Sequence, residues 1–141
     1  MTIFWMRAML GIPLATAGFT AVACGVCVED KIAAAYDYAI VTQAAAKKHQ
    51  VAFFALDGRV IDNEVEQRTL ARIAQGTRGV DPFTARVSTA NAALSVAFDP
   101  AVVTFAALER ALGKRLAPKG LTLLRLQVMA QTSDFKKRAS P

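Results

Sequence analysis

Apolar residues recur at helical spacing in three stretches of the chain. The stretch 28–46 contains no glycine or proline, starts with acidic residues and is followed by basic ones, so it predicts one leading helix. The stretch 63–75 begins with an Asn and a Glu three positions apart, a capping box, and ends before a glycine. A third helix is expected after Thr104, which caps a leucine stripe at Leu108, Leu112 and Leu116.

Four shorter runs have strand patterns, and they alternate with the second and third helices: 51–56, 81–89, 92–99 and 121–129. From residue 50 onward the order is therefore βαββαβ. This is the order of a ferredoxin-like α+β domain, with a four-stranded antiparallel sheet and two helices on one face. In the last strand, period two predicts that Leu124, Leu126 and Val128 share one face.

The first strand is apolar on both sides, with Phe53 facing one way and Phe54 the other. In this topology the strand is central, so the second face of the sheet also needs a cover. The extra leading helix and a second copy of the chain are the two candidates. We expect the leading helix to be the cover.

A second register spells the same order of elements and stays open. It uses a strand at 17–23, the helix 28–46, a hairpin at 51–61, the helix 63–75 and a strand at 82–88. It turns the N-terminal segment into a core strand and leaves 90–129 without a place in the sheet.

The segment 1–23 has the pattern of a secretory signal peptide. Arg7 is its only charge, and small residues at 21 and 23 form a cleavage site. We expect export to the periplasm or cell envelope, with cleavage before Cys24; an uncleaved membrane anchor is the alternative. A cysteine at that position partly matches a bacterial lipoprotein signal, which makes Cys24 a candidate lipidation site. At the other end, 130–141 is polar and basic and predicts a flexible tail.

The composition of the chain excludes several classes of function. The 141 residues suffice for one domain, and the net charge of +6 is scattered along the chain. His49 is the only histidine, and we expect it to satisfy the end of the leading helix. Because no carboxylate pair, phosphate loop or activated serine stands out, we expect no enzyme. Run 92–99 lacks the basic-glycine-aromatic motif of RNA-recognition sheets, so no nucleic-acid partner is expected.

Three short motifs occur in a familiar order. They are Gly79-Val80, then Phe98-Asp99-Pro100 at a strand end, then a threonine-capped helix with Leu-x-x-Ala-Leu over 108–112. In this order they resemble the second half of a heavy-metal-associated domain, the ferredoxin-like domain of copper chaperones and metal-transport ATPases. The resemblance implies a metal-binding CxxC in the loop after the first strand. Here that loop, 57–62, has neither cysteine nor methionine, so no ligand carries over in place.

The chain has a CxxC elsewhere, at Cys24 to Cys27, before the leading helix. Two thiolates suit a soft ion of low coordination number such as Cu(I) or Hg(II), whereas zinc needs two further ligands. A helix over 28–46 is about 28 Å long and a strand of about seven residues about 23 Å. Running antiparallel, they return the CxxC to the sheet end that carries loops 57–62, 89–91 and 117–120. We therefore predict Cys24 and Cys27 as metal ligands at that end.

The resemblance also implies a supporting charge. In the family's copper chaperones a lysine of the last loop faces the thiolates, and Lys119 is the matching residue. The expected cofactor is Cu(I) or another soft ion, and the expected partner is a membrane transporter or another envelope protein. Membrane contact is expected only if Cys24 is lipidated or the signal stays uncleaved.

Other roles of the cysteines remain open. In an exported protein the pair can be a redox disulfide. Lipidation of Cys24 would leave Cys27 alone and remove the dithiol. The competing function is then a non-catalytic envelope lipoprotein or interaction module, with a metal-domain-like fold and no bound ion.

Overall fold

The computed structural model describes residues 25–130 and, for side chains, residues from Val28 onward. The predicted signal peptide 1–23, Cys24 and residues 131–141 of the predicted tail lie outside the described residues. Within 25–130, no helix is long and apolar enough to cross a membrane. The elements in chain order are helices α1 (Gly25–Ala35) and α2 (Tyr38–Ala46), β1 (Gln50–Asp57), α3 (Glu64–Gln75), β2 (Arg86–Ser88), β3 (Ala93–Phe98), α4 (Phe105–Leu116), a 3-10 turn (Ala117–Lys119) and β4 (Thr122–Met129).

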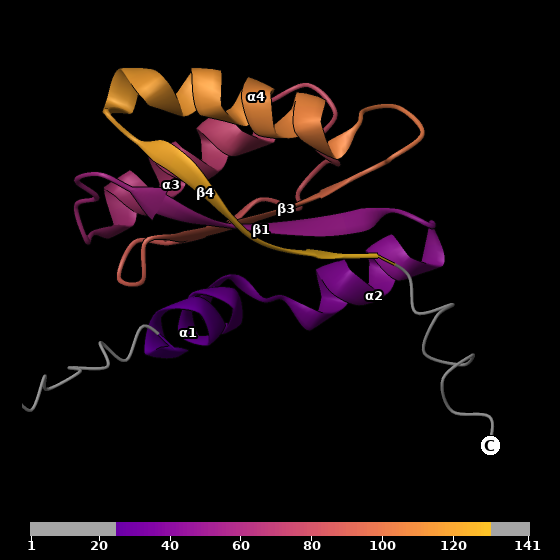
Figure 1. Cartoon of the computed structure of the whole chain (residues 1–141), viewed down its shortest axis with the longest axis horizontal. Helices are drawn as coiled ribbons and strands as arrows, with labels where there is room; N and C mark the ends of the chain where they lie inside the picture. The colour runs from indigo at the N-terminus through magenta and orange to yellow at the C-terminus, as the bar shows by residue number, and fades with distance from the viewer. Residues whose placement is uncertain (1–24, 131–141) are drawn as a thin grey trace, which may run out of the picture.

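The four strands form one antiparallel sheet in the order β2-β3-β1-β4. This is the predicted ferredoxin-like α+β fold, so the expectation of βαββαβ after an extra N-terminal helical segment is confirmed. Helices α3 and α4 lie on one face of the sheet, and α1 and α2 lie on the other (Figure 1). The alternative register is wrong, because β1 is followed by α3 and pairs with β3 and β4 instead of forming a hairpin at 51–61.

The face under α3 and α4 holds the larger core. Phe54 and Phe98 are fully buried there, and Phe54 stacks on Phe105 of α4 with ring centroids 5.8 Å apart. The predicted leucine stripe of α4 points into this core, as does Leu70 of α3. Burying side chains of this size supplies most of the hydrophobic stabilisation of the domain. The main buried contributors are Ala52, Phe54, Leu56, Leu70, Leu94, Val96, Phe98, Leu108, Leu112 and Leu116.

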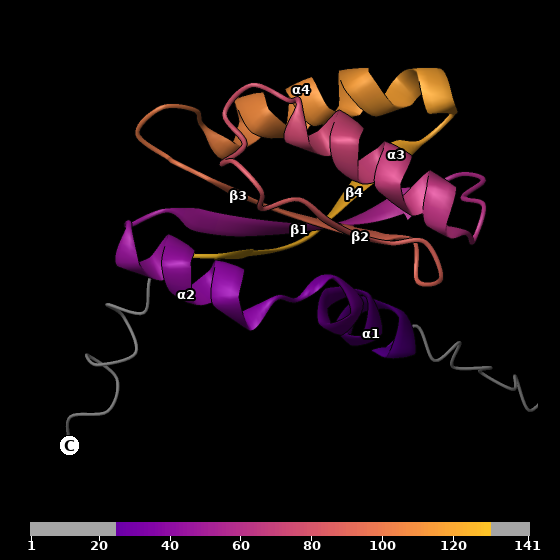
Figure 2. The ribbon, with the colours of Figure 1, turned by 180° about the vertical axis from the view of Figure 1, so that it is seen from behind.

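The second face is covered by the N-terminal segment, as expected. Ile40 and Ala44 of α2 and Ala35 of α1 are buried against Val51 and Phe53 of β1, together with Ala93 and Ala97 of β3. Figure 2 shows both helices on this side of the sheet when the molecule is seen from behind. The apolar second side of β1 is therefore buried within the chain.

The leading segment is two helices, so the prediction of a single helix over 28–46 is wrong. Asp37 has an extended backbone (φ −131°, ψ 112°), and its carboxylate accepts from the Ile40 N–H at 3.2 Å as the N-cap of α2. Arg86 of β2 donates to the same carboxylate at 2.9 Å. The Ile40 N–H and Arg86 both stabilise the charged form and lower the pKa of Asp37 below its ordinary value of 3.8. On the other side of the break, the buried Ser95 hydroxyl donates to the Ala35 carbonyl at the end of α1, at 2.6 Å.

Two strand predictions also need correction. The run 81–89 forms a strand only over β2, because the loop before it leaves the sheet between the Val80–Phe98 bridge and Arg86. In β4, Phe53 pairs with Gln127 but Phe54 pairs with Arg125, so Leu126 is an extra residue, a β-bulge. The bulge reverses the alternation of side chains. Leu126 therefore packs toward α1 and α2, whereas Val128 packs with the α3/α4 core.

Candidate metal centre

One end of the sheet carries three loops and the start of α1. The loops follow β1, join β2 to β3 and precede β4, and α1 lies beneath this end of the sheet (Figure 1). The first and third loops approach closely at Gly58, whose φ is +123°. A Cβ at Gly58 would lie 2.5 Å from the Gly120 carbonyl oxygen, so glycine is required there.

Lys31 fastens α1 to this end of the sheet. Its ammonium group donates to the carbonyl oxygens of Asn91 and Ala92, and the bond to Ala92 is 3.3 Å long. Ala92 adopts a left-handed backbone with φ +47°, and its carbonyl also accepts the Leu56 N–H of β1 at 2.8 Å. The middle of α1 is thus held against the loop between β2 and β3.

The two predicted thiol ligands are placed only through the backbone of α1. Cys24 lies outside the described residues, and Cys27 is the third residue of α1, one turn before Lys31. The helix begins at Gly25, so Cys27 lies in its first turn and not before the helix, as the sequence led us to expect. Free N–H groups in a first turn favour a thiolate. Glu29 and Asp30 are both exposed and act in the opposite direction.

Lys119 has a partner that the sequence did not reveal. Its ammonium group lies 3.0 Å from a carboxylate oxygen of Glu66 on α3, and the Glu66 side chain is 11% exposed. Asn63 caps α3 as predicted, accepting from the Glu66 N–H at 2.7 Å. The carboxylate of Glu66 goes to Lys119, a contact between residues far apart in the chain that carries no local pattern. The predicted role of Lys119 toward the thiolates stays a prediction.

His49 lies at the other end of the sheet. Its backbone N–H donates to Ala44 O at 2.8 Å, which agrees with the expected role at a helix end. Its ring contacts two carboxylates, with Nδ1 2.6 Å from Asp81 and Nε2 3.5 Å from Asp99. The imidazole therefore connects the turn after α2 to two further segments, the one before β2 that contains Asp81 and the one after β3 that contains Asp99. Among the side chains that the structure describes, those of residues 28–130, no three of His, Cys, Asp or Glu converge as ligands for a metal ion.

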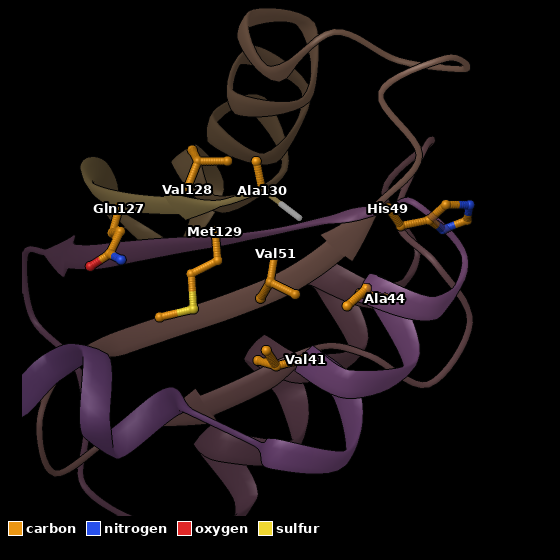
Figure 3. A pocket seen from close by; sticks show the side chains of 9 residues that line it. Val41, Ala44, His49, Val51, Gln127, Val128, Met129 and Ala130 are labelled. Carbon is orange, nitrogen blue, oxygen red and sulfur yellow. The ribbon is translucent and has the colours of Figure 1, made fainter. Parts of the chain in front are cut away.

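A pocket of about 370 Å³ lies beside His49, between α2 and the end of β4. Its walls are mostly apolar and include Val41, Val51 and Met129. Figure 3 shows the Met129 side chain pointing into the pocket, while the His49 ring points away from it. The pocket is therefore lined by a thioether and aliphatic groups. The imidazole does not contribute to it, because both ring nitrogens contact the carboxylates of Asp81 and Asp99.

The comparisons with known proteins add likenesses of fold. No family model and no curated protein matches the sequence. The chain is similar to oxidized MerP from Ralstonia metallidurans CH34, at 19% identity and a TM-score of 0.44, over 56% of this chain and 99% of that one. It is also similar to a copper binding domain from HMA7, a P-type ATPase, at 16% identity and a TM-score of 0.45, over 56% and 96%. At these values neither likeness assigns a role to a residue.

Proposed function

We propose that the protein is exported and binds a soft metal ion of the Cu(I) type through Cys24 and Cys27. The observation that carries this proposal is the position of α1, whose first turns lie at the sheet end that carries the three loops. Lys31 holds α1 there through the Asn91 and Ala92 carbonyls. The geometry expected from a single long helix survives the break at Asp37, because α1 still returns to that end.

Lys31 supplies a cation near the start of α1 that would stabilise a pair of thiolates and oppose the negative charges of Glu29 and Asp30. A Cu(I) ion with two thiolates carries one net negative charge, which a nearby cation stabilises. Lys31 binds neutral carbonyl oxygens, and no ion pair within the part of the chain that the structure describes includes it. Lys119 is already paired with Glu66. We therefore assign the supporting charge to Lys31 before Lys119, and we propose an envelope protein such as a membrane transporter as the partner.

Two measurements test this function. Mass spectrometry of the natively processed protein should find Cys24 at the N-terminus with no lipid attached. A Cu(I) competition titration of the reduced protein should then show one tight site that is lost in Cys27→Ala and kept in Val26→Ala, which retains both thiols. A diacylglycerol mass on Cys24, or equal copper retention by Cys27→Ala, would contradict the proposal and favour the envelope lipoprotein or interaction module.

A further inference from the structure

The loop before β2 leaves the sheet and presents an aromatic side chain to solvent. Between the Val80–Phe98 bridge and Arg86, the chain bulges away from β3. The Thr84 hydroxyl replaces the missing ladder partner by accepting from the Ala97 N–H at 3.2 Å. At the tip of this bulge, Phe83 is 87% exposed.

The loop is held rigidly by side chains around it. The Gln75 amide donates to the Asp81 carbonyl at 2.7 Å and accepts from the Thr84 and Ala85 N–H groups at 3.0 and 3.1 Å. Arg86 donates to the Phe83 and Ala85 carbonyls at 3.3 and 3.1 Å. An exposed side chain on such a loop loses little further freedom when a partner binds it.

Phe83 is an unfavourable choice for the fold. Its φ of +60° lies in the left-handed region, which is strained for an aromatic residue and free of strain for glycine. Its ring is almost wholly exposed to water, so burial of the ring contributes little hydrophobic stabilisation to offset this strain. Backbone strain that is not offset by side-chain packing is typical of positions that contact a ligand.

Beside Phe83 is a pocket of about 440 Å³, lined by Ala71, Gln75 and Ala85 as well as by Arg72 and Arg86. No ion pair among the residues that the structure describes includes Arg72. Figure 2 shows β2 at the edge of the sheet next to α3, the two elements that flank this pocket. We propose that Phe83 and Arg72 form a docking site for a segment of a partner protein that carries a carboxylate next to a large apolar side chain.

Charge selects this partner over a second copy of the chain. The pocket is lined by two guanidinium groups and no acidic residue, and because Arg86 is already paired with Asp37, Arg72 supplies its uncompensated charge. Two copies meeting here would bring their uncompensated Arg72 side chains together, and each chain has a net charge of +6. An acidic segment instead gains a carboxylate–guanidinium contact beside an aromatic anchor.

The test is selection of random displayed peptides on the full chain, with counter-selection on Phe83→Gly. The recovered peptides should be enriched in Asp or Glu within a few positions of a large apolar residue. Binding of one such peptide should weaken roughly 30-fold in Phe83→Gly and about tenfold in Arg72→Gln, and should fall with added salt. Val102→Ser, another exposed apolar residue, and Arg68→Gln, an arginine one turn away on α3, are the controls and should bind normally.

The stability of the same variant separates a docking role from a structural one. Because glycine relieves the strain at φ +60°, Phe83→Gly should melt about 3 °C higher than the wild type while losing the peptide. A lower melting temperature would show that Phe83 supports the fold and would overturn the proposal. Recovery of no peptides or of neutral ones would do the same. So would a wild-type dimer in sedimentation that Phe83→Gly dissociates, because the occupant would then be a second copy.

Discussion

The two faces of the sheet are covered in different ways. Under α3 and α4 the core consists of two phenylalanines and a set of leucines, which are most of the largest fully buried side chains of the described chain. Under α1 and α2 it consists largely of alanines, with Ile40, Val51 and Phe53 as the larger members. The first cover depends on buried apolar volume. The second depends more on polar contacts, through Lys31, Asp37 and Ser95.

This difference separates the fold from the candidate site. Burial of large side chains makes α3 and α4 inseparable from the sheet, because removing them exposes most of the core. The helix α1 gives up little apolar area when it leaves, so its local opening should require less free energy than global unfolding. Cys27, one of the two proposed metal ligands, lies in the first turn of this less firmly held helix. Metal binding and the position of α1 should therefore be thermodynamically linked.

The largest expected effect comes from truncating one buried side chain on each face. Leu112→Ala under α4 should lower the free energy of unfolding by about 3–4 kcal/mol. Ile40→Ala in α2 should lower the free energy of unfolding by about half as much. Ile40 is 7% exposed, so the side chains around it can partly fill the space that the substitution leaves. Urea denaturation measures both. Equal losses would contradict the view that the α1/α2 cover is the lighter one.

A smaller effect is expected at the contact that ends α1. Ser95→Ala leaves the Ala35 carbonyl without its donor in a buried position, which should cost about 1–2 kcal/mol. Amide hydrogen exchange should accelerate in α1 and change little in α4. Thr69→Ala, which removes another hydroxyl-to-carbonyl hydrogen bond, on the exposed side of α3, is the control and should leave exchange in α1 unchanged. Equal acceleration in both helices would show that α1 does not open separately.

Lys31→Gln should have a still smaller effect on stability, below about 1 kcal/mol, because the contact is partly exposed. Its effect on α1 should nevertheless be local and visible as faster exchange of the amides near the start of that helix. Lys47→Gln, at the end of α2, is the control. If Lys31→Gln also weakens Cu(I) binding while Lys119→Gln does not, the assignment of the supporting charge to Lys31 is strengthened; the reverse result would contradict it.

The smallest effect is the pH dependence of the break between α1 and α2. The pKa of Asp37 is lowered in the folded state, so its charge stabilises the fold above the ordinary value of 3.8, and this contribution is lost as pH falls through the folded value. Asp37→Asn keeps a capping oxygen but loses the charge. The wild type should therefore melt higher than Asp37→Asn near about pH 6, and the difference should shrink below pH 3.8. In an Arg86→Gln background the difference should be smaller but still present, because the Ile40 N–H, the largest cause of the lowered pKa of Asp37, remains.

The elements supported by several local signals were predictable. Helix α3 has its Asn63 cap and its glycine stop, and α4 has a threonine cap and a leucine stripe; both begin and end almost where expected. Both faces of β1 are apolar, which correctly predicted a cover on each side. These features depend on neighbours in the chain or on burial, and both leave a pattern in the sequence.

The features that were missed depend on contacts between distant residues. The break at Asp37 needs Arg86 from β2 and Ser95 from β3, and a single aspartate in an alanine-rich helical stretch gives little warning of it. The ion pair of Lys119 with Glu66 likewise joins residues far apart in the chain and leaves no local pattern in the sequence. At the candidate site, the sequence alone placed the start of the leading segment at the correct end of the sheet. That prediction followed from the lengths of the helix and the strand and from their antiparallel direction. The contact of Lys31 with the loop between β2 and β3 could not have been predicted, because the spacing of charges along the chain does not distinguish Lys31 from other lysines.

The bulge at Leu126 has a consequence for how the molecule avoids self-assembly. Strand β4 is apolar, long and at the edge of the sheet, which is the profile of a segment that templates cross-β stacking. The bulge interrupts its regular hydrogen-bond spacing near the middle, so an identical strand cannot pair with it along its full length. Arg125, next to the bulge, is held by Glu109 at 2.7 Å and lies 4.2 Å above the Phe105 ring, which keeps a charge beside the exposed edge. One inserted residue thus opposes regular pairing of this edge with a second strand.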